Sequence, residues 1–205
     1  MPDRLAERLR VCTDVQSVLD TALDRCLTLV GTGLGNIQLA DWTDGHLKIA
    51  AQRGFSGDFL RFFAQVGADD SSACGRALRA RDVIIVYDVE NDKAFSPASR
   101  SIVLGEGVRA VQSIPLISAS GAFVGMLSTH FEAVRSPSNN ELAAMKALAQ
   151  IAANAVIAQR ARRPNLYQSS LDLIASSKTL LRRIAQGEGL DHDPSEPAKS
   201  LTRRA

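Results

Sequence analysis

The sequence is poor in residues that would build a disulfide framework, a metal centre or an export route. Its 205 residues include only three cysteines, which are widely spaced, form no CxxC pair and share no zinc-type spacing with the three histidines. No continuous apolar run approaches the roughly 18 residues of a membrane span. The N-terminal MPDRLAERLR carries charges where a signal peptide needs an apolar stretch. We therefore expect reduced thiols, no membrane association and a cytoplasmic location.

Aromatic residues and net charge are also scarce, which argues against a nucleic-acid partner. The net charge is +2, and the basic excess lies in residues 160–205, with nine basic and five acidic side chains. That segment has one aromatic residue, Tyr167, and no recognisable nucleic-acid motif. Nucleic-acid binding is not expected.

Hydrophobic content is 45%, enough for a substantial core, and its periodicity alternates between helical and strand-like. Thr13 and Gln16 have the spacing of a capping box, which places a helix start there. Ser138 and Glu141 repeat this spacing before a long apolar helix. The expected helices are 3–12, 13–30, 57–66, 69–81, 139–163 and 165–186. The expected strands are one that includes Ile37 and Leu39, a return strand that begins with Leu47 and Ile49, and the strands 83–89, 109–118 and 122–132. Residues 90–108 are expected to form a long loop with at most one helical turn.

Hairpin joins between most of these strands predict an antiparallel sheet in an α+β domain. We expect five to six strands, with the long terminal helices on one face and short helices and the long loop over a pocket on the other. The expected organisation is a helical extension (1–13), a core domain (14–163), an amphipathic helix (164–186) and a disordered tail (187–205).

Three stretches of this chain resemble a GAF domain, the small-molecule sensing module of bacterial signalling proteins. This resemblance implies a GAF/PAS-like fold. The three stretches are LGNIQLADWTDGHLKIAAQRGF, SSACGRALRARDVIIVYDVENDKAF and GVRAVQSIPLISASGAFVGMLSTHF. The third is the most specific, with Arg-x-x-x-Ser-x-Pro-Leu, a glycine hairpin and Gly-x-Leu-Ser. The resemblance covers about residues 14–160 and is similar to the version found in sensor histidine kinases.

This resemblance implies a pocket under the short helices, an unidentified small-molecule ligand and a homodimer formed through the end helices. It also implies a signalling partner such as a kinase or regulator. It implies no particular ligand or cofactor, because one fold hosts many functions. After Arg163 the chain has no phosphoacceptor-histidine helix and no glycine-rich ATP lid, so a kinase activity does not follow.

Cys74, in DDSSACGRALRAR (69–81), is expected in the first turn of a helix, where the helix dipole can lower a thiol pKa. Its open interpretations are bilin attachment, thiol catalysis, a redox-sensing or ligand-lining thiol, and an inert wall residue. The bilin-binding relatives have His after the attaching Cys, whereas Gly75 follows here. Thiol catalysis as in free methionine sulfoxide reductases needs a resolving thiol, and Cys26 is expected in the core under another helix.

The remaining candidate ligand-binding residues lie on the last two strands. Alternation places Val124, Met126, Ser128 and His130 on one face, and Phe123, Leu127, Thr129 and Phe131 on the other. The first face is more polar and should meet the pocket.

His130 is then either a ligand contact or a hydrogen-bonded strand-end histidine. Arg109 is either a clamp for an anionic ligand or an ion-pair partner of Asp88 or Glu106. Ser113 and Gln112 point to opposite faces, and one of them should reach the pocket.

Together these residues predict a non-enzymatic sensory module whose ligand contacts are Cys74, Arg109, Ser113, Ser128 and His130. Two alternatives remain open. One is a small thiol enzyme or redox sensor that uses Cys74. The other is an interaction module without a ligand.

Overall fold

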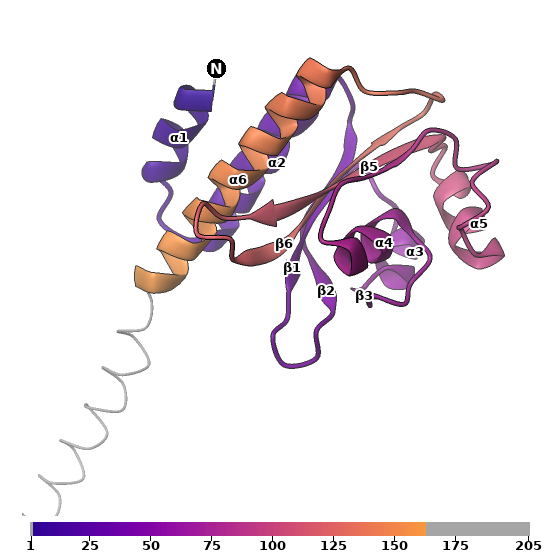
Figure 1. Cartoon of the computed structure of the whole chain (residues 1–205), viewed down its shortest axis with the longest axis horizontal. Coiled ribbons are helices and arrows are strands. Elements are labelled where there is room, and N and C mark those ends of the chain that lie inside the picture. Colours follow the sequence, from indigo (N-terminus) through magenta and orange to yellow (C-terminus); the bar gives the residue numbers. More distant parts are fainter. Residues whose placement is uncertain (1, 163–205) are drawn as a thin grey trace, which may run out of the picture. The chain divides into compact units, whose positions relative to one another are not determined.

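The computed structural model describes residues 2–162, which form a six-stranded sheet with helices on both faces (Figure 1). The helices are α1 (Pro2–Arg10), α2 (Val15–Val30), α3 (Gly57–Phe62), α4 (Ala73–Ala80), α5 (Pro97–Gly105) and α6 (Asn139–Arg162). The strands are β1 (Leu34–Ala40), β2 (Leu47–Arg53), β3 (Gln65–Val66), β4 (Ile84–Val86), β5 (Ala110–Ile117) and β6 (Phe123–Phe131).

The sheet has the strand order β3-β2-β1-β6-β5-β4, and every pair of neighbours is antiparallel. The two longest hairpins, β1–β2 and β5–β6, meet through β1 and β6 at the centre. This confirms the α+β class and the antiparallel sheet expected from the hairpin signals. The sixth strand is β3, a two-residue edge strand that follows α3.

One face of the sheet is covered by the long helices α2 and α6, as expected, and α1 packs on these two helices rather than on the strands (Figure 1). α2 begins one residue later than the Thr13–Gln16 capping box indicated, because Asp14 is the N-cap and its carboxylate accepts the Ser17 amide at 2.8 Å. It ends at Gly31, which has the left-handed conformation (φ 70°) that glycine tolerates best. α6 is capped by Ser138, whose hydroxyl accepts the Glu141 amide as expected.

The opposite face is covered by α3, α4 and α5 (Figure 1), which enclose a second apolar cluster. The segment 90–108 is more ordered than the long loop expected there. Ser96 caps α5 by accepting the Ser99 amide, and Pro97 stands in the first turn, where its missing N–H costs nothing. Phe59 of α3 and Phe63, which follows the helix, are buried in this cluster, whereas Phe62 is 41% exposed.

Strand alternation separates the two faces over most of β6. Leu127 and Phe131 belong to the core under the long helices, whereas Met126 belongs to the other cluster. The expected faces of Phe123 and Val124 are wrong, because Val124 packs under the long helices and Phe123 does not. A register shift opposite Leu116 and Ile117 places an extra residue in β6 and reverses the alternation there.

Two glycines allow the central layers to approach closely. A Cβ built on Gly125 of β6 would lie 2.0 Å from the Gln38 carbonyl oxygen of β1. A Cβ on Gly35 of β1 would lie 2.6 Å from the Leu27 side chain of α2. Only a residue without a side chain fits at these two contacts, which set the spacing of β1 against β6 and of α2 against the sheet.

Among residues 2–162, α6 alone is long and apolar enough to cross a membrane by length and composition, a property missed in the search for a continuous apolar run. It contacts α1, α2 and β5 and buries seven side chains, so it serves as a core helix here. The helix expected over 164–186 and the disordered tail expected over 187–205 lie outside the described residues.

Candidate functional site

A small cavity lies between the centre of the sheet and the short helices. Its walls come from β1, β5 and β6 on one side and from α3, α4 and α5 on the other. The cavity holds about 20 Å³, room for about one ordered water. The described residues that line it are apolar, aromatic or polar without charge: Asn36, Gln38, Phe59, Phe63, Ser72, Ala73, Cys74, Phe95, Val103, Val111, Ser113, Ser128 and His130.

The polar floor of the cavity follows from strand register. Asn36 of β1 and Ser113 of β5 are both register partners of Ser128 of β6, so these three residues form one row across the sheet. The two serine hydroxyls are 2.8 Å apart, and one donates to the other. Gln38 lies two residues along β1 from Asn36 and therefore on the same face. The sheet thus presents a buried polar patch to the cavity.

Several polar atoms of this patch have no partner. Asn36 Oδ1, both amide atoms of Gln38 and His130 Nδ1 are buried and make no hydrogen bond to any residue in the described range 2–162. The three residues are 4%, 1% and 5% exposed, respectively. A buried polar group left unpaired costs about 1–3 kcal/mol of stability. Their convergence on one cavity indicates a place for a hydrogen-bonding guest.

His130 is a neutral imidazole in this setting. Burial lowers its pKa to about 3, since a charged ring would lose its hydration. Its ring packs edge-on against Phe55 and Phe59, with centroid separations of 4.8 and 5.8 Å. The aromatic neighbours leave the imidazole as a hydrogen-bonding group without a charge at neutral pH.

Cys74 occupies the first turn of α4, as expected, but its thiol is not activated. The helix is capped by Ser72, whose hydroxyl lies 3.2 Å from Cys74 Sγ. Burial raises the pKa of Cys74 to about 11, and this outweighs any lowering by the helix dipole. The expectation of a lowered pKa is therefore wrong, and the thiol is protonated at neutral pH.

The other two thiols are remote from Cys74. Cys26 is buried in the core under the long helices, on the far face of the sheet. Burial also raises the pKa of Cys26, to about 12. Cys12 packs against that same core, and all three cysteines are free. Among residues 2–162, Cys74 is the one cysteine that lines the cavity.

Arg109 lies outside the cavity lining. Its guanidinium contacts Asp88 and Glu90, each at 2.9 Å. Hydrogen bonds from Arg109 hold the pKa of Asp88 below its usual value. Glu106, the other partner considered for Arg109, instead accepts hydrogen bonds from the Ser56 backbone and hydroxyl. The structure thus brings four of the five expected residues together and places Arg109 in an ion-pair cluster.

Asn36 and Gln38 were missed as site residues by the sequence analysis. They alternate with Ile37 and Leu39, and this pattern is typical of a strand with one solvated face. In the structure that polar face is buried by the short helices. The sequence pattern that could have identified them is a pair of amide side chains two residues apart, on a strand that lies beside the strand with the Gly-x-Leu-Ser motif.

The wall formed by α5 is fastened to its neighbours by polar contacts. Arg76 of α4 pairs with Asp92 at 3.0 Å, and both side chains are largely buried. The Ser96 amide donates to the Ser71 hydroxyl at 2.9 Å. Glu106 binds Ser56 at the start of α3. We call residues 91–106 the α5 segment. These contacts hold the α5 segment against the cavity.

The sequence and the fold are both similar to those of known proteins. A family model described as GAF domain matches residues 12–156. A domain assigned to a two-component sensor histidine kinase from Sinorhizobium meliloti has 20% identity and a TM-score of 0.61, covering 72% of this chain and 94% of that one.

Two further solved structures share the fold. Free methionine-R-sulfoxide reductase from Neisseria meningitidis has 17% identity and a TM-score of 0.64, covering 78% of this chain and 89% of that one. A phycocyanobilin-bound GAF domain from a cyanobacterial phytochrome has 20% identity and a TM-score of 0.60, covering 80% and 95%. No curated protein matches. The family match spans most of the chain and agrees with the sheet and the two helical layers: this protein belongs to the GAF domain family.

Proposed function

We propose that this chain is a non-enzymatic sensory module that binds a small molecule in the cavity between β1, β5, β6 and the short helices. The observation that carries the proposal is the set of unpartnered buried atoms on Asn36, Gln38 and His130. A guest molecule that pairs with them removes their desolvation penalty, so binding stabilises the folded domain. Ser113, Ser128 and Cys74 complete the ligand contacts.

The signal leaves through the opposite face of the sheet. Neighbouring residues on β5 and β6 point alternately to the cavity and to the long helices. Next to Ser113, Gln112 donates to Glu141 of α6 at 3.2 Å. A ligand that shifts Ser113 therefore also displaces the contact that holds the start of α6. The output is a change in the terminal helices, read by a partner such as a kinase or regulator in the cytoplasm.

Sensing is favoured over thiol catalysis by the state of Cys74. A catalytic thiol must reach its thiolate form and needs a group to resolve its oxidised product. Burial holds the pKa of Cys74 at about 11. The other cysteines belong to the core on the far face. Arg109 is engaged with acids and contributes no charge to the cavity.

Native mass spectrometry of the gently purified protein tests the proposal. We expect a retained small molecule, or binding of one from a metabolite mixture, that is lost in Ser128→Val, where methyl groups replace the cavity hydroxyl. Thr129→Val is the matched control, because Thr129 is fully buried on the other face of the same strand. Binding that survives Ser128→Val, or no binding by the wild type, contradicts the proposal.

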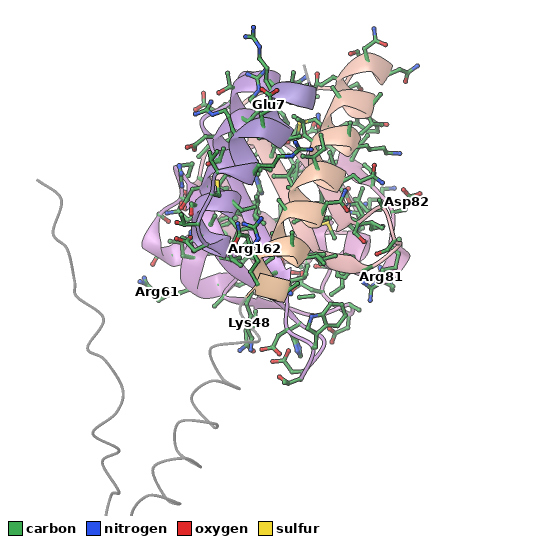
Figure 2. All side chains as sticks on the ribbon, turned by 90° about the vertical axis from the view of Figure 1, so that its left-hand side faces the viewer. Glu7, Lys48, Arg61, Arg81, Asp82 and Arg162 are labelled. Atoms are coloured by element: carbon green, nitrogen blue, oxygen red, sulfur yellow. The ribbon has the colours of Figure 1, made fainter. Side chains whose placement is uncertain are left out.

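We also propose a homodimer formed through the terminal helices. The helix layer faces the viewer in Figure 2, with α6 ending at Arg162. A groove of about 270 Å³ runs between α1 and α6, lined by residues that include Leu9, Ile151 and Ala155. A second copy would fill this largely apolar surface.

Light scattering at micromolar concentration tests the assembly. Ala158→Glu places a charge in the groove and should give a monomer. Ala143→Glu, on an exposed part of α6 outside the groove, should leave a dimer. A monomeric wild type, or a dimeric Ala158→Glu variant, contradicts the assembly.

A further inference from the structure

We infer that the cavity selects an uncharged small molecule with an amide-type edge, in which a hydrogen-bond donor stands beside an acceptor. The inference rests on the proposed sensory function, since it names the ligand class of the same site. It follows from three properties of the cavity: its lack of charge, the geometry of its unpartnered atoms and its aromatic wall.

None of the cavity-lining residues within 2–162 has an ionised side chain. Its one titratable base, His130, is neutral because burial opposes its protonation. Two partly buried cationic side chains of the short-helix layer, Arg76 and Arg100, lie outside the cavity lining and make other contacts. Arg76 pairs with Asp92, and Arg100 donates to the backbone carbonyls of Asp92 and Phe95. An anion in this cavity would lose its hydration and meet no ionised counter-charge, only the partial positive charge of the α4 N-terminus, which replaces that hydration poorly. A cation would meet no carboxylate among the lining residues.

The unpartnered atoms indicate which hydrogen-bonding groups a ligand must carry. Gln38 offers one donor group and one acceptor from a single planar amide, and neither has a partner. Such a carboxamide pairs edge-on with a ligand that carries an acceptor beside a donor, as when Gln or Asn binds the N6/N7 edge of adenine. Asn36 Oδ1 adds a second acceptor that requires a ligand donor.

The serine pair supplies one more donor. When one hydroxyl of Ser113 and Ser128 donates to the other, the acceptor's own proton stays free for the guest. The cavity can therefore give and receive hydrogen bonds along one side, all from neutral groups. This pattern matches amides, lactams and ureas better than carboxylates or phosphates, which present acceptors alone.

The wall opposite the sheet suits a flat guest of limited size. Phe59, Phe63 and Phe95 face the polar floor, and aromatic rings pack well against planar ligands. The cavity holds about 20 Å³, so a guest larger than water requires the lining side chains or the α5 segment to shift outward. An ordered water is the competing occupant of the cavity at this size.

Matched pairs of neutral and anionic probes of similar shape test the inference. The probes are nicotinamide against nicotinate and the smaller propionamide against propionate, titrated into the full chain at pH 7.5 and followed by NMR. We expect at least one amide to bind at least tenfold more tightly than its acid. That binding should fall at least tenfold in Gln38→Met, which keeps the length of the side chain and removes both amide atoms. Gln112→Met is the matched control, because Gln112 is equally buried on the opposite face.

The outcomes separate this inference from the function beneath it. If an acid binds as tightly as its amide, or neither amide binds, the ligand class is overturned. A molecule retained in native mass spectrometry then still upholds sensing. If the retained molecule is an anion and Gln38→Met no longer retains it, the proposed ligand class is overturned but the sensory function is not. If neither a retained molecule nor any probe is detected, both the ligand class and the sensory function fail.

Discussion

Replacing Gln38 by Met should stabilise the ligand-free protein, although it alters a fully buried position in the central strand. Gln38 is 1% exposed, and neither polar atom of its amide has a partner. An unsatisfied buried polar group costs about 1–3 kcal/mol. Met has nearly the same length and shape, carries no strong polar group and adapts to irregular cavities. We expect the free energy of unfolding to rise by about 1–3 kcal/mol.

Urea unfolding followed by far-ultraviolet circular dichroism measures this change. The transition midpoint should rise with an unchanged m-value, because the area exposed on unfolding is nearly the same. The melting temperature should rise by roughly 2–4 °C for each kcal/mol in a chain of this size. Gln112→Met provides the comparison. It also removes an unpartnered oxygen, but it loses the hydrogen bond to Glu141, so its net change should be close to zero.

Destabilisation by Gln38→Met would refute the reasoning. That result would mean that Gln38 already has partners in solution, for example an ordered water in the cavity, whose loss leaves the water unpaired. Equal changes in the free energy of unfolding for Gln38→Met and Gln112→Met would also refute it. An unpartnered amide facing the cavity would then cost no more than an amide paired with α6. Stabilisation together with lost ligand binding is the pattern of a residue kept for function.

Three further outcomes follow from the same structure. Burial lowers the pKa of His130 to about 3, so below pH 6.5 the unfolded chain binds a proton at this residue that the folded chain does not bind. The free energy of unfolding should therefore fall by about 2 kcal/mol between pH 6 and 4.5. His130→Gln should reduce this pH dependence, as measured by urea titrations at each pH. With its pKa raised to about 11, Cys74 should react with iodoacetamide at pH 8 about 100-fold more slowly in the native protein than in urea; comparable rates, read by peptide mass spectrometry, would contradict the burial argument. Gly125→Ala forces a Cβ to within 2.0 Å of the Gln38 carbonyl and should cost about 1–3 kcal/mol in thermal unfolding, whereas Gly33→Ala meets nothing within 4 Å and should be nearly neutral; equal costs would refute the close approach of β1 and β6.

The sheet and the helical layers could be predicted because their signals are local. Asp44-Gly45 and Ala119-Ser120-Gly121 mark the hairpins, and Ser138 marks the start of α6. The faces of Ser128 and His130 followed from strand alternation. The reversal at Phe123 did not, because a register shift between β5 and β6 depends on both strands and leaves no mark on either sequence alone.

The candidate site was less predictable because burial is a tertiary property. Asn36 and Gln38 have the pattern of a solvated strand face, and only the packing of α3, α4 and α5 makes that face interior. The thiol of Cys74 shows the same limit. Its position in the first turn of α4 was predicted, but the sign of its pKa shift depends on how deeply the helix is buried, and burial dominates here.

The single-layer sheet has a consequence for how such a protein can diversify. Ser113 and Gln112 are adjacent in the chain, yet one lines the cavity and the other meets α6. In the proposed function, mutations at the positions of β1, β5 and β6 that face the cavity can therefore change the ligand specificity and leave the packing of the long helices intact. Mutations at the positions that face the long helices can likewise change the contacts of α6 and leave the cavity lining intact. A new specificity and a new output can thus be acquired in separate steps, each on its own side of one shared backbone.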